Sequence, residues 1–152
     1  MSAEAKLAEL HLQLPPPPKV GGVYKPVVIV GDLAYVSGHV SINAEGSIIA
    51  GRVGSEVDQE FGKKAAEAAG LAILSTLKAN LGSLDRVKRV IKTLGMVNAA
   101  ADFKNHPEVI NGCSELWAKV WGQENGIGAR SAVGMGSLPR NATIEIEAIF
   151  QI

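Results

Sequence analysis

Apolar and polar positions divide the chain into segments of two different periods. Val27–Val30 and Leu33–Val40 are runs rich in β-branched residues, and Gly31-Asp32 between them is typical of a two-residue hairpin turn. A second turn at Asn43–Gly46 leads to Ile48-Ile49, which predicts a short third strand. Further strand-like runs occupy residues 87–97, 130–135 and 142–152.

Helical spacing of apolar residues predicts two helices between these strands. The longer covers Ser55–Leu81, with Ser55 as its N-cap and Asp58 in the first turn, and Gly82 ends it. The second runs from Pro107, a residue favoured at the first helical position, to Trp121, before Gly122.

The first 19 residues form an extension to the domain predicted at residues 20–152. Ala3, Leu7, Leu10 and Leu14 recur at helical spacing, which predicts a short helix ended by the prolines. Pro15–Pro18 should run as an extended polyproline spacer. The extension either packs against the body of the protein or serves as a regulatory tail.

The predicted order is three strands, a helix, a strand, a helix and two strands. This order is typical of an α+β fold in which two helices cover one face of a mixed sheet. The other sheet face is then uncovered and rich in Val and Ile. We therefore expect it to meet another copy of the chain in a closed homo-oligomer.

Composition narrows the class of protein. The chain has 152 residues, enough for one domain, and its 15 basic residues balance its 15 acidic ones. This neutrality argues against nucleic acid as a partner, although Lys88, Arg89 and Lys92 could form a local basic patch. A single cysteine, no apolar run long enough to cross a membrane and no signal-like N-terminus lead us to expect a cytoplasmic protein.

Few residues suggest chemistry. The sequence has no phosphate-binding glycine loop, no cysteine–histidine cluster spaced for a metal and no recognisable catalytic triad. Arg130 opens an apolar strand, where a guanidinium needs an anionic partner. From the residues alone, that partner is either a bound carboxylate or one of Glu145 and Glu147, which would make a structural ion pair.

Several motifs resemble those of the Rid family, also called the YjgF or endoribonuclease L-PSP family. The similarity is strongest in Ala129-Arg130-Ser131, Leu138-Pro139 and Ile144–Ile149. Weaker matches precede them, at Gly22–Tyr24, Gly31–Leu33, Val36–His39, Leu84–Val87, Asp102-Phe103 and Val109–Asn111. His39 and Ser114 stand where this family commonly has a glutamine and an aromatic residue, and together with the N-terminal extension these differences indicate a longer, divergent branch.

The resemblance implies a chorismate-mutase-like fold, a homotrimer and clefts between neighbouring subunits. It further implies a deaminase that hydrolyses a small 2-imino acid or enamine to a 2-keto acid and ammonia, without metal or cofactor. Arg130 would hold the substrate carboxylate and Glu145 would position a water molecule. The cleft would be lined by Tyr24, Ser37, Gly38 and Asn111.

Two other functions remain open. The same cleft could bind small carboxylates without catalysis, or the protein could be an endoribonuclease or translation inhibitor, as family members are often labelled. His39 is either an acid or base in the cleft or a structural histidine. Cys113 is either a core residue or a thiol activated near the N-terminal half of its helix.

Overall fold

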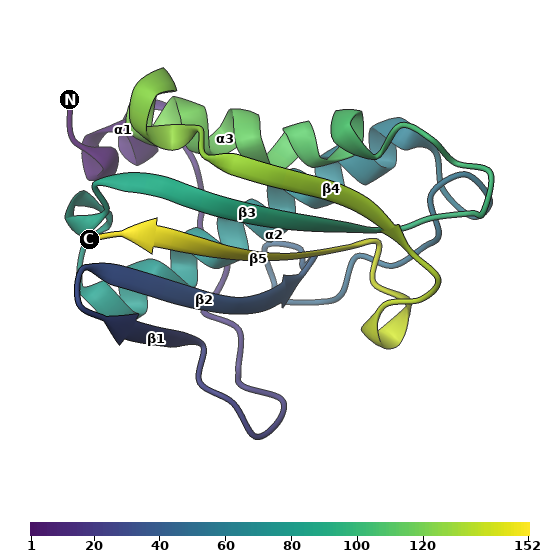
Figure 1. The fold of residues 1–152 in the computed structure, drawn as a ribbon, viewed down its shortest axis with the longest axis horizontal. Helices are drawn as coiled ribbons and strands as arrows, with labels where there is room; N and C mark the ends of the chain where they lie inside the picture. Colours follow the sequence, from purple (N-terminus) through teal and green to yellow (C-terminus); the bar gives the residue numbers. More distant parts are fainter.

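The computed structural model describes all 152 residues and contains one mixed sheet backed by helices (Figure 1). The strands are β1 (Val27–Val30), β2 (Leu33–Val40), β3 (Arg89–Asn98), β4 (Ala129–Met135) and β5 (Ile144–Gln151). The helices are α1 (Ala3–Glu9), α2 (Gln59–Leu81) and α3 (His106–Gly126). Short 3-10 turns lie at Leu84–Arg86 and Pro139–Asn141.

The strand order is β1-β2-β5-β3-β4, and only β3 and β4 run parallel. The parallel pair is possible because α3 provides the long crossover connection that parallel strands require. Helices α2 and α3 lie on the same face of the sheet (Figure 1). The predicted α+β class and the two-helix layer are therefore confirmed.

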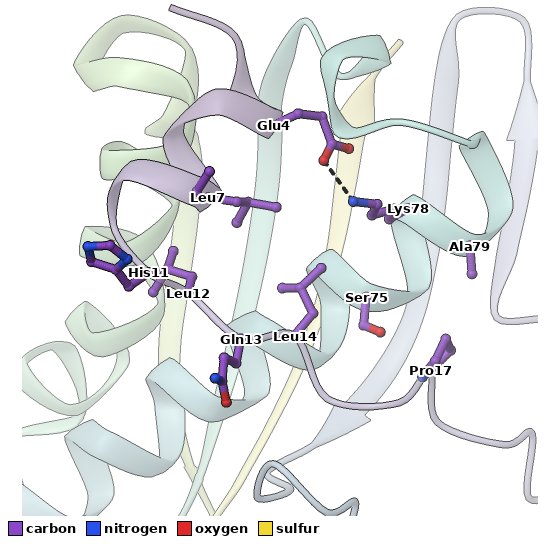
Figure 2. A pocket seen from close by; sticks show the side chains of 11 residues that line it. Glu4, Leu7, His11, Leu12, Gln13, Leu14, Pro17, Ser75, Lys78 and Ala79 are labelled. Atoms are coloured by element: carbon purple, nitrogen blue, oxygen red, sulfur yellow. Dashed lines mark hydrogen bonds and ion pairs between the residues drawn. The ribbon is translucent and has the colours of Figure 1, made fainter.

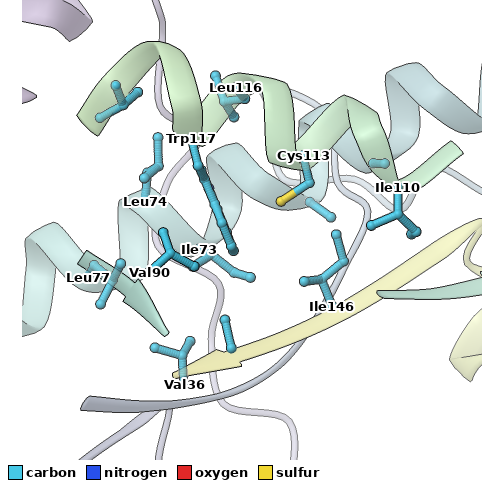
Figure 3. Packing of buried hydrophobic residues seen from close by; sticks show 14 of the residues in the cluster. Val36, Ile73, Leu74, Leu77, Val90, Ile110, Cys113, Leu116, Trp117 and Ile146 are labelled. Atoms are coloured by element: carbon cyan, nitrogen blue, oxygen red, sulfur yellow. The ribbon is translucent and has the colours of Figure 1, made fainter. Parts of the chain in front are cut away.

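A single core lies between the sheet and these two helices (Figure 3). Trp117 of α3 is fully buried, and its ring meets Phe150 of β5 edge-on at a centroid distance of 5.2 Å. Small residues let the helices approach closely: a Cβ on Gly112 of α3 would overlap the backbone carbonyl of Lys63 on α2. This close contact fixes α3, and with it the neighbouring Asn111, above the sheet.

The N-terminal helix packs on the body of the protein rather than extending from it. Ala3 and Leu7 are buried and belong to the main core. The prediction that the prolines end this helix is wrong. It ends at Glu9, and His11 then takes a left-handed backbone conformation with φ 53°.

Three other boundaries differ from the prediction. The N-cap of α2 is Asp58 rather than Ser55, because residues 52–57 form a separate turn in which the backbone N–H of Ser55 bonds to Arg52. Ile48 makes only an isolated bridge to Ile42, so the predicted third strand does not form. Gly122 interrupts α3 with φ 84°, as predicted, but the chain resumes a final turn to Gly126.

The second face of the sheet carries no helix (Figure 1). Side chains that alternate with the buried ones point to this face, and several apolar ones are exposed, including Val28, Tyr35 and Val133. An open apolar face favours an oligomer, and the homotrimer stays a prediction. No helix combines the length and apolar character of a membrane span.

Candidate functional site

Arg130 lies near the start of β4, at the edge of the sheet, opposite Thr93 of β3. Its side chain turns toward α3, where Nη1 donates to Asn111 Oδ1 at 2.8 Å and to Ser114 Oγ at 3.2 Å. Asn111 and Ser114 are three residues apart on the helix and so share one of its faces. The close packing of α2 and α3 holds this face over the strand.

Arg130 has no acidic partner within its own chain. The three ion pairs of the molecule join Lys6 to Glu9, Lys63 to Glu115, and Lys78 to Glu4. The hypothesis of an internal ion pair between Arg130 and Glu145 or Glu147 is therefore wrong for the single chain.

The guanidinium instead lines a pocket of about 500 Å³ between α3 and β4. Both hydrogens of Nη1 have partners, whereas the hydrogens of Nε and Nη2 have none in the protein. Those three N–H groups form a planar fork suited to a carboxylate. We call this space the arginine pocket.

Tyr24, Ser37, Gly38 and Glu145 lie together in a second pocket of about 860 Å³, which we call the glutamate pocket. Glu145 of β5 is half-buried there, and its carboxylate lies over Gly38 of β2. A Cβ at position 38 would overlap Glu145 Oε1, so only glycine leaves room for the acid in this position.

Burial raises the pKa of Glu145 above its usual value, and the negative charge of Glu147 raises it further. Both side chains point to the open face of the sheet because they are two residues apart on β5. A carboxylate with a raised pKa is a better proton acceptor than an ordinary one.

The Ser37–Gly38 segment is a bulge in β2 that His39 holds in place. The register of β2 against β5 shifts between Val36 and His39. The His39 ring donates from Nδ1 to the carbonyl oxygen of Ser37 at 2.6 Å, since a carbonyl can only accept. His39 Nε2 then accepts from the hydroxyl of Thr76 on α2, at 2.7 Å.

These contacts identify His39 as a structural histidine. Its side chain is buried, both ring nitrogens have protein partners, and burial lowers its pKa, an effect that the hydrogen bond to Ser37 partly opposes. The same bulge extends toward Tyr24, because Ser37 Oγ donates to the carbonyl oxygen of Lys25 at 2.6 Å.

The two pockets lie apart within one chain. Arg130 pairs with Thr93, which in turn pairs with Ala148, so Arg130 lies three strands' width from the β2 bulge. Its side chain also points to the helical face, whereas that of Glu145 points to the open face. The structure thus brings Arg130 and Asn111 together, and Glu145 with Tyr24, Ser37 and Gly38, but it does not join these two groups.

Sequence reasoning missed two residues of these pockets. Ser114 accepts a hydrogen bond from the same nitrogen of Arg130 as Asn111 does. The three-residue spacing of Asn111 and Ser114 on one helical face could have indicated that they act together. Glu147 lies beside Glu145 in the glutamate pocket, and the alternation of side chains along β5 was enough to predict that both face the same side.

Cys113 is fully buried, and desolvation raises its pKa despite the opposing charge of Arg130, so it is a core residue. No group of three or more His, Cys, Asp or Glu side chains is placed to hold a metal ion.

A mixed sheet of this order, with two helices on one face, is consistent with the YjgF/chorismate-mutase-like class that the sequence motifs resemble. Residues 4–149 match the model of the family described as "YjgF/chorismate_mutase-like, putative endoribonuclease", and the chain belongs to this family. The resemblance seen in the sequence motifs is thereby confirmed.

Similar proteins extend over nearly the whole chain. Protein TCP17 of Trypanosoma cruzi is 36% identical over 148 residues, covering 97% of this chain and 92% of that protein. The 2-iminobutanoate/2-iminopropanoate deaminase of Dermatophagoides farinae is 26% identical over 144 residues, covering 93% of this chain and 94% of that protein. The crystal structure of protein Atu1372 from Agrobacterium tumefaciens has a TM-score of 0.88 at 42% identity, covering 99% of this chain and 91% of that one.

Proposed function

We propose that this protein hydrolyses a small 2-imino acid to a 2-keto acid and ammonia, in clefts between the subunits of a homotrimer. The observation that carries the proposal is the Arg130 guanidinium, which lines a pocket with three N–H groups that have no protein partner. A planar carboxylate beside an electrophilic imine carbon matches such a site. The deaminase of Dermatophagoides farinae, 26% identical, is consistent with this activity.

In the proposed reaction Arg130 binds the substrate carboxylate through Nε and Nη2. Asn111 and Ser114 hold Nη1 and so fix the plane of the fork. Glu145, whose raised pKa suits proton transfer, accepts a proton as the oxygen of a water molecule bonds to the imine carbon. The imine nitrogen takes up this proton from Glu145 and then the proton of the added hydroxyl group, and it leaves as ammonia when the C–N bond breaks and the carbonyl forms. Positioning and proton transfer suffice because the imine carbon is already electrophilic.

A second copy of the chain would complete the cleft. Arg130 and Glu145 point to opposite faces of one sheet, so no rotation of their side chains joins them. The loop that carries Tyr24 projects from the body of the protein (Figure 1), and Val23, which precedes Tyr24, is fully exposed. In a closed ring of three, the glutamate pocket of one subunit would meet the arginine pocket of the next.

The test is a comparison of Arg130→Ala with Arg89→Ala, in which the removed arginine is exposed and has no hydrogen-bond partner. Each protein is mixed with an enzyme that generates 2-aminoacrylate, and release of keto acid and ammonia is followed. We expect Arg130→Ala to lower kcat/KM by ~100-fold, because a bidentate charge-assisted contact is lost, and Arg89→Ala to leave it unchanged.

Wild-type protein that gives no acceleration would contradict the proposal. So would RNA cleavage that survives rigorous nuclease removal but disappears in Arg130→Ala, since that result would favour an endoribonuclease.

A carboxylate-binding module without catalysis is the second candidate, because the arginine pocket is formed within one chain and does not need Glu145. This alternative predicts that 2-keto acids raise the melting temperature of the wild type but not of Arg130→Ala, with no turnover in either. Turnover by the wild type would exclude it.

A further inference from the structure

Helix α1 of the N-terminal extension is held to α2 and to the 3-10 turn after it by polar contacts. Glu4 accepts hydrogen bonds from Lys78 Nζ at 2.8 Å and from the backbone N–H of Leu84 at 3.0 Å. Figure 2 shows the Glu4–Lys78 ion pair beside Leu7, which is buried. Polar and apolar contacts together therefore fix the position of α1.

A second anchor lies where the polyproline segment begins. The hydroxyl of Ser75 on α2 donates to the carbonyl oxygen of Pro15 at 2.6 Å, and both residues are buried. Figure 2 shows Ser75 on α2 between Leu14 and Pro17. From this point the chain leaves α2 with three further prolines, whose fixed φ angles keep it extended and stiff.

The stiff proline segment and the three residues that follow it line the glutamate pocket. Residues 16–21 contribute to its wall together with Tyr24 and Glu145. The backbone N–H of Gly21 donates to the hydroxyl oxygen of Tyr24 at 3.3 Å, so the same segment also helps to orient Tyr24. The extension thus runs from an anchor on α2 to the pocket that holds the proposed proton acceptor.

We infer that residues 16–21 determine which substrates the site accepts, by forming a rigid wall that limits the size of the side chain on the imino acid. This inference rests on the proposed function. With the substrate carboxylate on Arg130 and its imine carbon near Glu145, the rest of the molecule must fit within the glutamate pocket. The anchor at Pro15 and the three prolines that follow it stiffen the near part of this wall, so it resists displacement by a bulky group more than a flexible loop would.

The experiment measures kcat/KM for 2-imino acids of increasing size. An amino-acid oxidase generates them in place from alanine, 2-aminobutyrate, leucine and phenylalanine. The proteins are the full-length wild type, a variant with Pro16→Gly, Pro17→Gly and Pro18→Gly, and Ser75→Ala, which removes the anchor at Pro15. Ser55→Ala is the matched control, because the side chain of this exposed serine has no hydrogen-bond partner.

We expect the wild type to prefer the small substrates. The triple glycine variant should raise the ratio of kcat/KM for leucine-derived to alanine-derived imine by about 10-fold, the scale on which pockets discriminate methylene groups. Ser75→Ala should change the ratio in the same direction and Ser55→Ala should not. A role in stability alone would change the melting temperature but leave this ratio unaltered.

The inference and the proposed function fail in different ways. A wild type that hydrolyses these imines while both loosened variants keep its size preference overturns the inference alone. If no protein hydrolyses any imine, the proposed function is wrong, and the size dependence is then measured as Kd for the corresponding 2-keto acids by calorimetry. The same change of ratio in binding supports the wall, whereas unchanged ratios or no binding overturn it.

Discussion

Arg130 is where the local structure and the proposed chemistry meet. Its side chain crosses from an edge strand to α3, and two neutral oxygen atoms rather than a carboxylate hold one of its nitrogens. The positive charge is therefore fixed in direction without being neutralised. A residue in this state can bind an anion at little cost in side-chain entropy, because its geometry is already set.

Glu147 should shift the pH dependence of the proposed reaction. Burial and the charge of Glu147 raise the pKa of Glu145, and Glu145 must be ionised to accept a proton. The rate should thus rise with pH as Glu145 deprotonates. We expect Glu147→Gln to move this acid limb of the kcat/KM profile to lower pH, but only in part, because burial remains. Glu9→Gln, on α1, is the control and should leave the profile in place.

His39 should make the folded protein less stable in mild acid. Burial lowers its pKa in the folded state, so the unfolded chain binds the proton first as pH falls below the ordinary value of about 6.5. Stability should then fall with a slope of up to ~1.36 kcal/mol per pH unit until His39 is protonated in the folded state as well. Urea unfolding at several pH values should give a shallower slope for His39→Gln. Equal slopes would show that His39 does not contribute.

The sequence could indicate which residues belong to a functional site, but not which of them lie next to one another in the folded chain. The sequence indicates Arg130 as a guanidinium in apolar surroundings, but it leaves open whether its partner is a ligand or an acid of β5, which lies two strands away and faces the other side of the sheet. Strand alternation gives the face of Glu145, but the face of Arg130 depends on how α3 crosses the sheet. That crossing depends on packing between residues far apart in the chain, such as Gly112 and Lys63.

At the scale of elements, segments with a clear period or turn signal were predictable, whereas helix ends and the isolated Ile48-Ile49 run were not. The hairpin of β1 and β2 and the helices α2 and α3 follow from spacing and turn residues. Ser55 and Asp58 are both residues that commonly cap helices. Asp58 is the N-cap here because residues 52–57 form a separate turn with its own backbone hydrogen bonds, so the helix begins only after it. Ile48-Ile49 has strand character, but it finds only one bridge, so propensity alone misled the prediction.

The contact between α2 and α3 should be intolerant of any side chain at Gly112. Alanine is the better helix former by about 1 kcal/mol, so Gly112→Ala would stabilise an isolated helix. Here its Cβ would meet the backbone of Lys63, which cannot move as a side chain can, and overpacking of this kind costs about 1–3 kcal/mol. We expect a lower melting temperature and weaker binding of carboxylates in the arginine pocket, because Asn111 next to Gly112 would shift with the helix.

Gly136→Ala is the matched control, because nothing lies within 4 Å of the position that its Cβ would take. Thermal unfolding of the two variants measures the difference. A Gly112→Ala protein as stable as the wild type would show that the two helices can separate without cost.

At the scale of the whole molecule, the proposed association of identical chains would account for both the uncovered sheet face and the two separated pockets. The open face carries exposed apolar side chains, and each chain offers an arginine pocket and a glutamate pocket that it cannot join by itself. A closed ring pairs every pocket of one kind with one of the other. The native mass should then be three times the 15.9 kDa of the chain.

Mixing two inactive variants tests this account most directly. Arg130→Ala and Glu145→Gln, carrying different tags and expressed together in equal amounts, should form mixed trimers that are purified through both tags. A cleft between subunits is intact when it takes Arg130 from one variant and Glu145 from the other, and each mixed trimer has one such cleft out of three, so the purified mixed trimers should show about a third of wild-type activity. If mixed trimers form and remain as inactive as either variant alone, Arg130 and Glu145 do not share a cleft across the interface, and the central claim is wrong.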